Sequence, residues 1–245
     1  MEQTYPMRIN KYLALKKIST RRGADLLVAD KKVFINGKLA LLGSKVNEKD
    51  LVEVKGAKPK EYKYFAYNKP VDILTHLTSS KEEKGLPVGQ RPRDIKEEIK
   101  NTGLPKDVFP IGRLDKNSHG LLILTNDGRI TDQLLSPEYS HEKEYVVRTS
   151  NKLRSSFKQK MEAGVNIEGY KTKPCKVKIV DDFTFKVILT EGKKHQIRRM
   201  CSALFQEIAD LKRERIMNIK LGNLKSNGFK EIKGKELEAF LKSLN

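Results

Sequence analysis

The sequence has no tryptophan and only two cysteines, Cys175 and Cys201, among its 245 residues. Two thiols provide neither a disulfide framework nor the four ligands of a structural zinc site. The histidines are scattered without the spacing of metal ligands: His76, His119, His141 and His195. We therefore expect no bound metal, and we expect both cysteines to be ordinary reduced thiols.

Long apolar segments are also missing. No run approaches the roughly 20 residues that a membrane-spanning helix needs, and no signal-peptide core lies near the start. The expected location is therefore cytoplasmic. The chain also lacks a phosphate-binding glycine loop, a dinucleotide-binding glycine fingerprint and a serine-hydrolase elbow, so many cofactor-dependent reactions lose priority.

Acidic residues are few relative to basic ones. The chain has 31 Asp and Glu against 50 Lys and Arg, which leaves a formal charge of +19 and a pI near 9.8. Such an excess indicates a polyanionic partner, with nucleic acid the leading candidate. The length allows one large domain or two unequal ones.

Residues 7–55 are predicted to form a compact α+β unit. Apolar residues recur at helical spacing in its first part, and Ser19 or Thr20 is expected to cap a second helix. The stretch Val33 to Lys38 predicts a strand with an Asn-Gly turn, and Leu51 to Val54 predicts another strand.

The first helices of this unit are strongly basic. Within the first 22 residues the single acid is Glu2, while the basic residues are Arg8, Lys11, Lys16, Lys17, Arg21 and Arg22. A solvated face on a helical hairpin is one explanation, and contact with nucleic acid is the other.

The rest of the chain is predicted to form a second, larger domain. Gly, Pro and lysines with little apolar content predict a linker over residues 57–63, which separates residues 1–56 from residues 64–245. Irregular alternation of strands and helices favours an α+β fold over a doubly wound parallel sheet. Residues 77–107 have mixed charges, prolines and no persistent period, which predicts a loop-rich insertion.

The elements expected in this second domain follow from the apolar periodicity. Strands are expected around residues 64–68, 121–124, 144–147, 175–180 and 183–189. Helical segments are expected near residues 130–135, 153–161, 196–205 and 235–244.

Asp115 is the first candidate for chemistry. It ends a tight, glycine-flanked turn directly before an apolar strand, in the segment Phe109 to Leu122. A carboxylate in such a place can be held rigidly and can act as a nucleophile or a base. The alternative is that Arg113 and Asp115 form a structural ion pair or a turn cap.

Tyr145 is the second candidate, in the segment His141 to Val147. Period-two alternation places Tyr145 and Val147 on one face of a strand. A core tyrosine with a satisfied hydroxyl is one interpretation. The other is a ring that stacks on a base and a hydroxyl that moves a proton, which requires positive potential nearby because a free tyrosine has a pKa near 10.

The third candidate is a basic helix start between Glu191 and Met200. Arg198 and Arg199 point in directions about 100° apart on a helix, so they can serve different partners. A merely basic helix start is one interpretation. The sharper one gives one arginine to a catalytic carboxylate and the other to an RNA phosphate.

These segments together resemble the RsuA/RluF type of ribosomal RNA pseudouridine synthase, through GRLDKNSHGLLILTNDG, HEKEYVV, CKVK, EGKKHQIRRMC and RERIMN in that order. The first module resembles the αL RNA-binding module named after ribosomal protein S-four, through the run MRINKYLALKKISTRRGADLLVADKKVFINGKLALLGSKVNEKDLVEV. The resemblance extends over nearly the whole chain, and a match in order across two domains is more specific than any single motif.

The resemblance implies a catalytic domain built on a mixed, largely antiparallel sheet with flanking helices. It implies that Asp115 is the catalytic nucleophile, that Tyr145 is the active-site tyrosine and that Arg198 pairs with the aspartate. Such an arginine would keep the carboxylate ionised and offset its desolvation. It further implies RNA contacts by Arg8, Lys11, Arg21 and Arg22 in the first domain, and we assign further RNA contacts to Arg113, Lys194 and Arg199.

The implied reaction breaks the bond from ribose C1′ to uracil N1, turns the base and rejoins it through C5. No cofactor, metal or ATP is implied. Attack by Asp115 to form an adduct and proton abstraction from the ribose to form a glycal both remain open. The target uridine must leave its stack to reach the site.

The resemblance favours large-subunit (23S) ribosomal RNA as the substrate, with tRNA as a second candidate, and we expect a monomer. Three features depart from the family pattern and bear on target selection: Asp72 where glycine is frequent, Lys193-Lys194-His195 in place of a more arginine-rich run, and the segment 77–107. The main alternative is a noncatalytic RNA-binding ribosome-assembly factor. A DNA-binding regulator ranks lower because no helix-turn-helix or zipper pattern is present.

Overall fold

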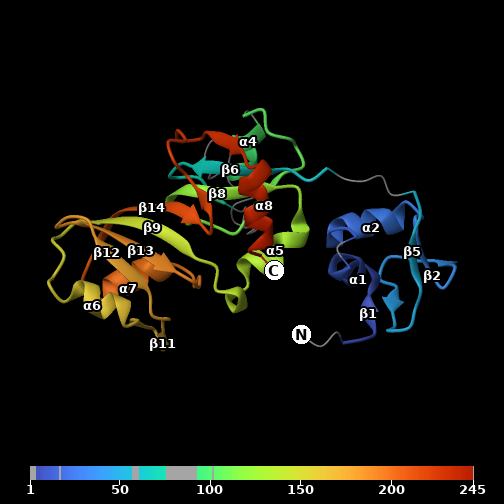
Figure 1. Ribbon diagram of the computed structural model, residues 1–245, viewed down its shortest axis with the longest axis horizontal. Coiled ribbons are helices and arrows are strands. Elements are labelled where there is room, and N and C mark those ends of the chain that lie inside the picture. The colour runs from blue at the N-terminus through green and yellow to red at the C-terminus, as the bar shows by residue number, and fades with distance from the viewer. Residues whose placement is uncertain (1–3, 17, 57–60, 76–92, 101, 245) are drawn as a thin grey trace, which may run out of the picture. The chain divides into compact units, whose positions relative to one another are not determined.

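The computed structural model describes residues 4–16, 18–56, 61–75, 93–100 and 102–244. The expected linker and the expected insertion therefore lie partly outside the described residues. The chain divides into two compact units, Met1–Tyr62 with Asp127–Thr131 and Lys63–Asn126 with Asp132–Asn245. Figure 1 labels the elements of both units.

The amino-terminal unit pairs two helices with short strands, as expected. Thr20 caps the second helix, because its Oγ1 accepts a hydrogen bond from the backbone N–H of Gly23 at 3.0 Å. The Asn36-Gly37 turn has φ of 50° and 75°, which is the left-handed backbone that a tight hairpin needs. The elements are β1 (Met7–Arg8), α1 (Ile9–Leu15), α2 (Arg21–Ala29), β2 (Val33–Ile35), β3 (Lys38–Leu39), β4 (Lys45–Val46) and β5 (Val52–Val54).

This unit has a hydrophobic core of its own. Ile9 and Leu13 of α1 pack with Ala24 and Val28 of α2 and with Val33 of β2. Their spacing of three to four residues places them on the inner faces of the two helices. The basic residues between them are thereby left on the outer faces.

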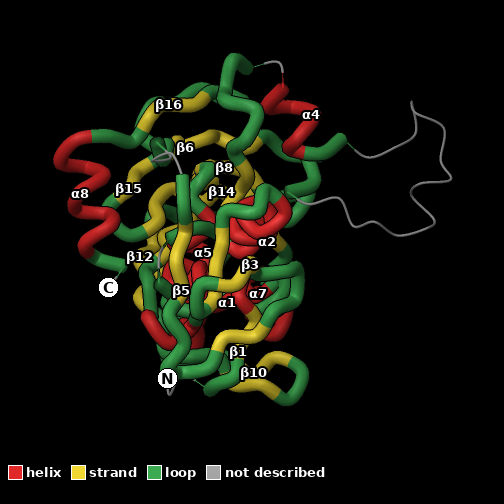
Figure 2. The backbone as a smooth tube through the Cα atoms, turned by 90° about the vertical axis from the view of Figure 1, so that its right-hand side faces the viewer, coloured by secondary structure: helices red, strands yellow, loops and turns green. Residues whose placement is uncertain are grey.

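The second unit is organised by one mixed sheet. Its strand order is β12-β13-β9-β14-β8-β6-β16, with β15 added beside β14 and β7 beside β8. Only the β14–β8 pair is parallel in this sheet, so the expected largely antiparallel α+β fold is confirmed. The strands are β6 (Tyr64–Lys69), β7 (Phe109–Ile111), β8 (His119–Thr125), β9 (Lys143–Thr149), β12 (Lys176–Ile179), β13 (Thr184–Leu189), β14 (Ile208–Ile216), β15 (Ile219–Lys220) and β16 (Phe229–Glu231). Figure 2 shows β14, β8, β6 and β16 following one another across the sheet.

Helices and one small hairpin complete this unit. The helices are α4 (Ile95–Lys100), α5 (Thr131–Leu135), whose first residue belongs to the first unit, α6 (Phe157–Glu162), α7 (Gln196–Ala203) and α8 (Gly234–Lys242), with the 3-10 turn η3 (Pro137–Tyr139). The 3-10 turn η2 (Gly128–Ile130) belongs to the first unit. The hairpin consists of β10 (Asn166–Ile167) and β11 (Tyr170–Lys171).

Each half of the sheet has its own core. On one half, Phe157 of α6 and Met200 of α7 pack against Phe185 of β13 and Val147 of β9; Figure 1 shows these helices beside β12 and β13. On the other half, Ile95 and Ile99 of α4 pack against residues of β6 and β8. Because β14 and β8 join the halves, residues at their contact are held from both sides.

The short strands β7, β10, β11, β15 and β16 were not expected from the sequence, and two larger differences bear on the site. The central strand β14 was not expected, because its run of acidic and basic residues hides an alternation in which Leu211 and Arg213 are buried. Helix α4 lies inside the segment 77–107 that was expected to be loop-rich. Its Ile95 and Ile99 provide only one helical repeat, which is too short for the period to be seen, and tertiary packing decides its structure.

Candidate active site

The loop between β7 and β8 carries Asp115 into the middle of the sheet. It begins at Gly112, whose φ of +77° is a turn conformation, and it ends at Gly120, the second residue of β8, with φ of +103°. A Cβ on Gly120 would lie 2.4 Å from the carbonyl oxygen of Arg213 in β14. Glycine is therefore required where β8 and β14 approach each other.

The backbone of this loop is held along its whole length. Each carbonyl from Arg113 to Ser118 accepts a hydrogen bond. The donors are the backbone N–H groups of Asp72 and Ser118, the hydroxyl of Thr75, the ammonium of Lys69 and the guanidinium groups of Arg198 and Arg213. A loop backbone fixed in this way positions Asp115 before the reaction, so little conformational entropy is lost when the reaction occurs.

Lys69 is the buried cation beneath this loop. Its side chain is completely buried, and its Nζ donates to the carbonyls of Pro70 at 2.8 Å and Ser118 at 2.9 Å. Burial lowers the pKa of Lys69 to about 8, although the negative charges of Asp115 and Asp72 act in the opposite direction. The ammonium therefore contributes positive potential near Asp115 at neutral pH.

Arg213 of β14 is a second buried cation in this region. Its Nε donates to the carbonyl of Leu121 at 2.7 Å and its Nη1 to that of Arg113 at 3.3 Å. Its Nη2 is buried without a hydrogen-bond partner among the described residues. The pKa of Lys143 is lowered to about 8, mainly by burial and also by the positive charge of Arg213.

The ionic partner of Asp115 differs from the expected one. The Nε2 of His195 lies 3.6 Å from Oδ1 of Asp115, and the two side chains are 49% and 37% exposed. Arg198 instead donates from Nη2 to the carbonyl of Asn117 at 2.8 Å and to Oγ of Ser118 at 3.2 Å. The expected Asp115–Arg198 ion pair is therefore absent among the described residues, and Arg198 holds the loop two to three residues beyond the carboxylate.

The reason lies at the start of α7. His195 has a left-handed backbone, with φ of 52°, and it directly precedes the helix. This turn places the imidazole toward Asp115 and places Arg198, one turn later, toward the end of the loop. Both residues therefore lie beside the same loop.

Glu191 holds the start of α7 in place through hydrogen bonds. It is buried, its carboxylate accepts hydrogen bonds from the hydroxyl of Tyr170 and from Nε2 of Gln196, and it also accepts the backbone N–H of Lys173. Gln196 is the first residue of α7, so this network ties the helix to the β10–β11 hairpin. Glu191 is thus a structural anchor that the sequence reasoning mentioned only as a motif boundary.

Tyr145 lies in the middle of β9, between Val187 of β13 and Arg213 of β14. It is partly buried and packs against the core that contains Val147. Its hydroxyl has no hydrogen-bond partner among the described residues. The alternation expected for Tyr145 and Val147 is confirmed, and Arg213 provides the nearby positive charge that a proton-transferring tyrosine would need.

The residues assigned to RNA contact in this unit have different surroundings. Arg113 and Lys194 are exposed. Arg199 is partly buried and already has partners within the protein. Its Nη2 donates to a carboxylate oxygen of Glu168 at 2.7 Å and to the carbonyl of Ile167 at 3.2 Å. Its contact with RNA stays a prediction, and the structure shows a role in joining α7 to β10.

The residues assigned to RNA contact in the first unit lie on its surface. Arg8, Arg21 and Arg22 are exposed, and Lys11 is half-buried. No ion pair involves them among the residues that the structure describes. Their cationic groups are therefore available for an anionic partner.

Lys69 and Arg213 were missed by the sequence reasoning. Lys69 follows an apolar strand in the run Tyr-Phe-Ala-Tyr-Asn-Lys-Pro, where a cation directly before a proline was the available signal. Arg213 lies in a charged run, and no pattern distinguishes it from its exposed neighbours. Their importance follows from burial, which only the tertiary structure provides.

No helix among the described residues is long and apolar enough to cross a membrane. In the same part of the chain, no group of three or more His, Cys, Asp or Glu side chains is arranged to hold a metal ion.

Two protein families match the chain. The RNA pseudouridylate synthase family matches residues 63–203, and the S4 domain family matches residues 7–52. The first match contains Asp115, Tyr145 and Arg198. The second contains the basic helices of the amino-terminal unit.

Individual relatives agree with the family match. The dual-specificity RNA pseudouridine synthase RluF of Escherichia coli (strain K12) is 39% identical over 236 residues, which are 94% of this chain and 77% of the relative. Ribosomal large subunit pseudouridine synthase B of Bacillus subtilis (strain 168) is 32% identical over 240 residues, 94% of each protein. A crystal structure of pseudouridylate synthase shares the fold, with a TM-score of 0.68 and 24% identity over 98% of this chain and 100% of that one.

Proposed function

The chain belongs to the RNA pseudouridylate synthase family, and on that premise we propose that it modifies uridine in 23S ribosomal RNA with Asp115 as its catalytic nucleophile. It is an isomerase that converts uridine to pseudouridine in RNA, and it carries an RNA-binding S4 domain. The enzymatic interpretation thus replaces the noncatalytic assembly factor.

The choice of large-subunit RNA is supported by the relatives. One is named a ribosomal large subunit pseudouridine synthase, and it aligns along 94% of both proteins. The RluF relative is named a dual-specificity enzyme. We therefore propose 23S RNA as the main substrate of this chain and tRNA as a second one. We propose a monomer, because Asp115, Tyr145 and Arg198 all come from one chain.

The observation that carries the assignment to Asp115 is its fixed loop. Every carbonyl from Arg113 to Ser118 is hydrogen-bonded, while the Asp115 side chain is 37% exposed and can be approached. A positioned, accessible carboxylate beside buried cations can attack the sugar or base, or remove a ribose proton. Both routes use the same residue and the same geometry.

The other residues have roles that follow from their places. Tyr145 is partly buried on β9 beside Arg213, so its ring can stack on the detached base and its hydroxyl can help to remove the C5 proton after rejoining. Arg198 holds the end of the Asp115 loop, and we propose that it turns to the carboxylate when RNA binds. The target uridine reaches this site by leaving its stack, at a cost of a few kcal/mol.

The test is site-resolved pseudouridine mapping in cells with and without the gene. We expect one or a few positions of 23S RNA to lose pseudouridine in the deletion strain and to regain it with the wild-type gene, but not with Asp115→Asn. Loss of pseudouridine in tRNA alone would contradict the proposed target. Restoration by Asp115→Asn would contradict the proposed nucleophile.

A further inference from the structure

Phe205 occupies an unusual position at the end of α7. Its φ is +59°, and the backbone N–H of Gln206 donates to the carbonyl of Cys201 at 2.9 Å, which is the pattern of a helix ended by a left-handed residue. Glycine is the usual residue there, because a side chain strains this conformation. Moreover, Phe205 is 71% exposed, so its ring adds little to the core.

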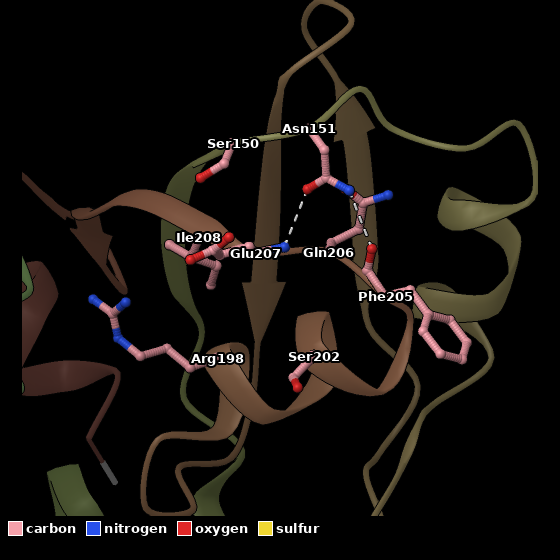
Figure 3. A pocket seen from close by; sticks show the side chains of 8 residues that line it. All are labelled: Ser150, Asn151, Arg198, Ser202, Phe205, Gln206, Glu207 and Ile208. Carbon is pink, nitrogen blue, oxygen red and sulfur yellow. Dashed lines mark hydrogen bonds between the residues drawn. The ribbon is translucent and has the colours of Figure 1, made fainter.

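The strained turn is nevertheless held firmly in place. The side chain of Asn151 donates from Nδ2 to the carbonyl of Phe205 at 3.2 Å, and its Oδ1 accepts the backbone N–H of Glu207 at 3.3 Å. The guanidinium of Arg154 lies over the ring, 5.1 Å from its centroid. Figure 3 shows the ring at the end of the helix, with Asn151 bridging the turn. A rigid exposed aromatic ring with an adjacent cation results.

A cavity of about 600 Å³ extends from this ring toward the catalytic loop. Arg198 and Ser202 line it from one face of α7, at positions i and i+4, and Phe205 lines it just beyond the end of the helix. The far end of the cavity is Arg198, which donates to the carbonyl of Asn117 at 2.8 Å beside Asp115. Figure 3 shows Arg198 and Phe205 at opposite ends of the group.

The charges around the cavity indicate what would fit. Arg198 lines the cavity and favours a phosphate group, and the guanidinium of Arg154 adds positive charge at the ring of Phe205, whereas Glu207 lines the wall and would repel a phosphate. The carboxylate of Glu207 and the amide of Asn151 can form hydrogen bonds with the edge of a base. Exposed aromatic rings beside cations are the usual stacking platforms for unpaired bases of RNA.

We propose that this cavity binds an unpaired nucleotide that flanks the target uridine, with its base stacked on the ring of Phe205 and its phosphate near Arg198. The inference rests on the RNA-modifying activity and deepens it, because it assigns a second nucleotide site at the carboxyl-terminal end of α7, whereas Arg198 in the first turns of that helix holds the catalytic loop. Holding a neighbour in this way would keep the target nucleotide outside its stack and would select for an unpaired flank.

The test compares Phe205→Gly with Phe205→Tyr. Glycine removes the ring and suits the left-handed backbone, so Phe205→Gly should fold at least as stably as the wild type. The substrate is total RNA labelled with tritium at uridine C5, prepared from the deletion strain, and the rate of tritium release is measured. Because Phe205→Gly loses the stacking on an aromatic ring, we expect its KM to be roughly 5- to 100-fold higher than that of the wild type, with kcat little changed. We expect Phe205→Tyr to behave like the wild type.

Two outcomes would overturn the proposal: a KM for Phe205→Gly within about twofold of the wild type, or an equal loss in Phe205→Tyr. A fall in kcat alone would also overturn it, because it would mean that the turn only supports α7. Separating the 23S and tRNA fractions after the reaction shows which RNA lost tritium. The proposal that 23S RNA is the main substrate is therefore tested separately from the comparison between Phe205→Gly and Phe205→Tyr.

Discussion

At the scale of single residues, the site depends on charges placed at different depths. Asp115 is accessible, while Lys69 and Arg213 are buried under its loop and donate to backbone carbonyls. The buried cations therefore act on Asp115 through positive potential and through the loop, without covering its carboxylate. His195 is the direct partner at 3.6 Å, and because it is half exposed the pair contributes little energy.

The first prediction separates His195 from Arg198. We expect His195→Gln to lower kcat by less than about 10-fold, because an exposed pair is worth at most about 1 kcal/mol. We expect Arg198→Met to lower kcat by about 100-fold or more. The substitution removes two hydrogen bonds to the loop, and it removes the positive charge that we propose pairs with Asp115 when RNA binds. Single-turnover rates on 23S RNA measure both effects. The reverse order would show that His195 is the functional partner.

The second prediction concerns Lys69 and pH. Its pKa is about 8 in the folded protein, against about 10.5 when unfolded, so the unfolded chain binds more protons between these values. The free energy of unfolding should therefore rise with pH in this window through Lys69, by up to about 3 kcal/mol, and this gain should be absent below pH 8.

Urea unfolding of the wild type and Lys69→Met at several pH values between 7 and 10 measures the effect. The difference in slope between the two proteins is the readout, because the substitution itself also removes hydrogen bonds at every pH. Lys106→Met, at an exposed position, is the matched control and should follow the wild type. Parallel curves for wild type and Lys69→Met would contradict the assignment.

At the scale of elements, the parallel contact between β8 and β14 is the critical one. It pairs Gly120, at the end of the Asp115 loop, with Arg213, and Arg213 in turn pairs with Tyr145 across β9 and β14. Helix α7 adds His195 and Arg198 from the other side of the loop, and Glu191 fixes its first turn. Three segments that are remote in sequence thereby meet at one place.

The third prediction follows from that contact. Gly120→Ala would place a Cβ 2.4 Å from the carbonyl oxygen of Arg213 at a φ of +103°, so the strands must separate. We expect a loss of about 3 kcal/mol or more in the free energy of unfolding, and a fall in kcat. Gly222→Ala is the control, because it also has a positive φ but meets nothing within 4 Å and should cost about 1 kcal/mol. Equal losses would show that the close approach is unimportant.

At the scale of the whole molecule, the chain combines two units with separate hydrophobic cores. The proposed catalytic residues lie in the larger unit, and the S4 domain supplies additional basic surface. The excess of 50 basic over 31 acidic residues is therefore used in two ways, for RNA binding in general and for the fixed cations around Asp115.

The fourth prediction concerns the amino-terminal unit. Removal of residues 1–56 should weaken binding to 23S RNA and reduce the slope of log affinity against log salt, because that unit supplies phosphate contacts. A full-length variant with Arg8, Arg21 and Arg22 changed to alanine should lose up to about three units of slope and keep its fold. Filter binding between 50 and 300 mM salt is the measurement. An unchanged slope in both proteins would remove the assignment of these residues to RNA.

Much of this protein follows from its sequence alone. The helical and strand periods, the Thr20 cap and the Asn36-Gly37 turn are local properties, so the residues themselves reveal them. The order of GRLDK, HEKEY and HQIRR likewise indicated the family by resemblance, and the family match confirms it. The identity of Asp115 as the leading candidate came from the same pattern.

The tertiary structure decided what depends on burial and long-range pairing. Charge alone could not show that Arg213 and Lys69 are buried beneath the Asp115 loop, that β14 is a central strand, or that α4 packs inside the expected insertion. It also placed His195, rather than Arg198, beside Asp115, because a single left-handed residue before α7 sets the direction of both side chains. Such outcomes depend on contacts between segments far apart in the chain, and no local pattern records them.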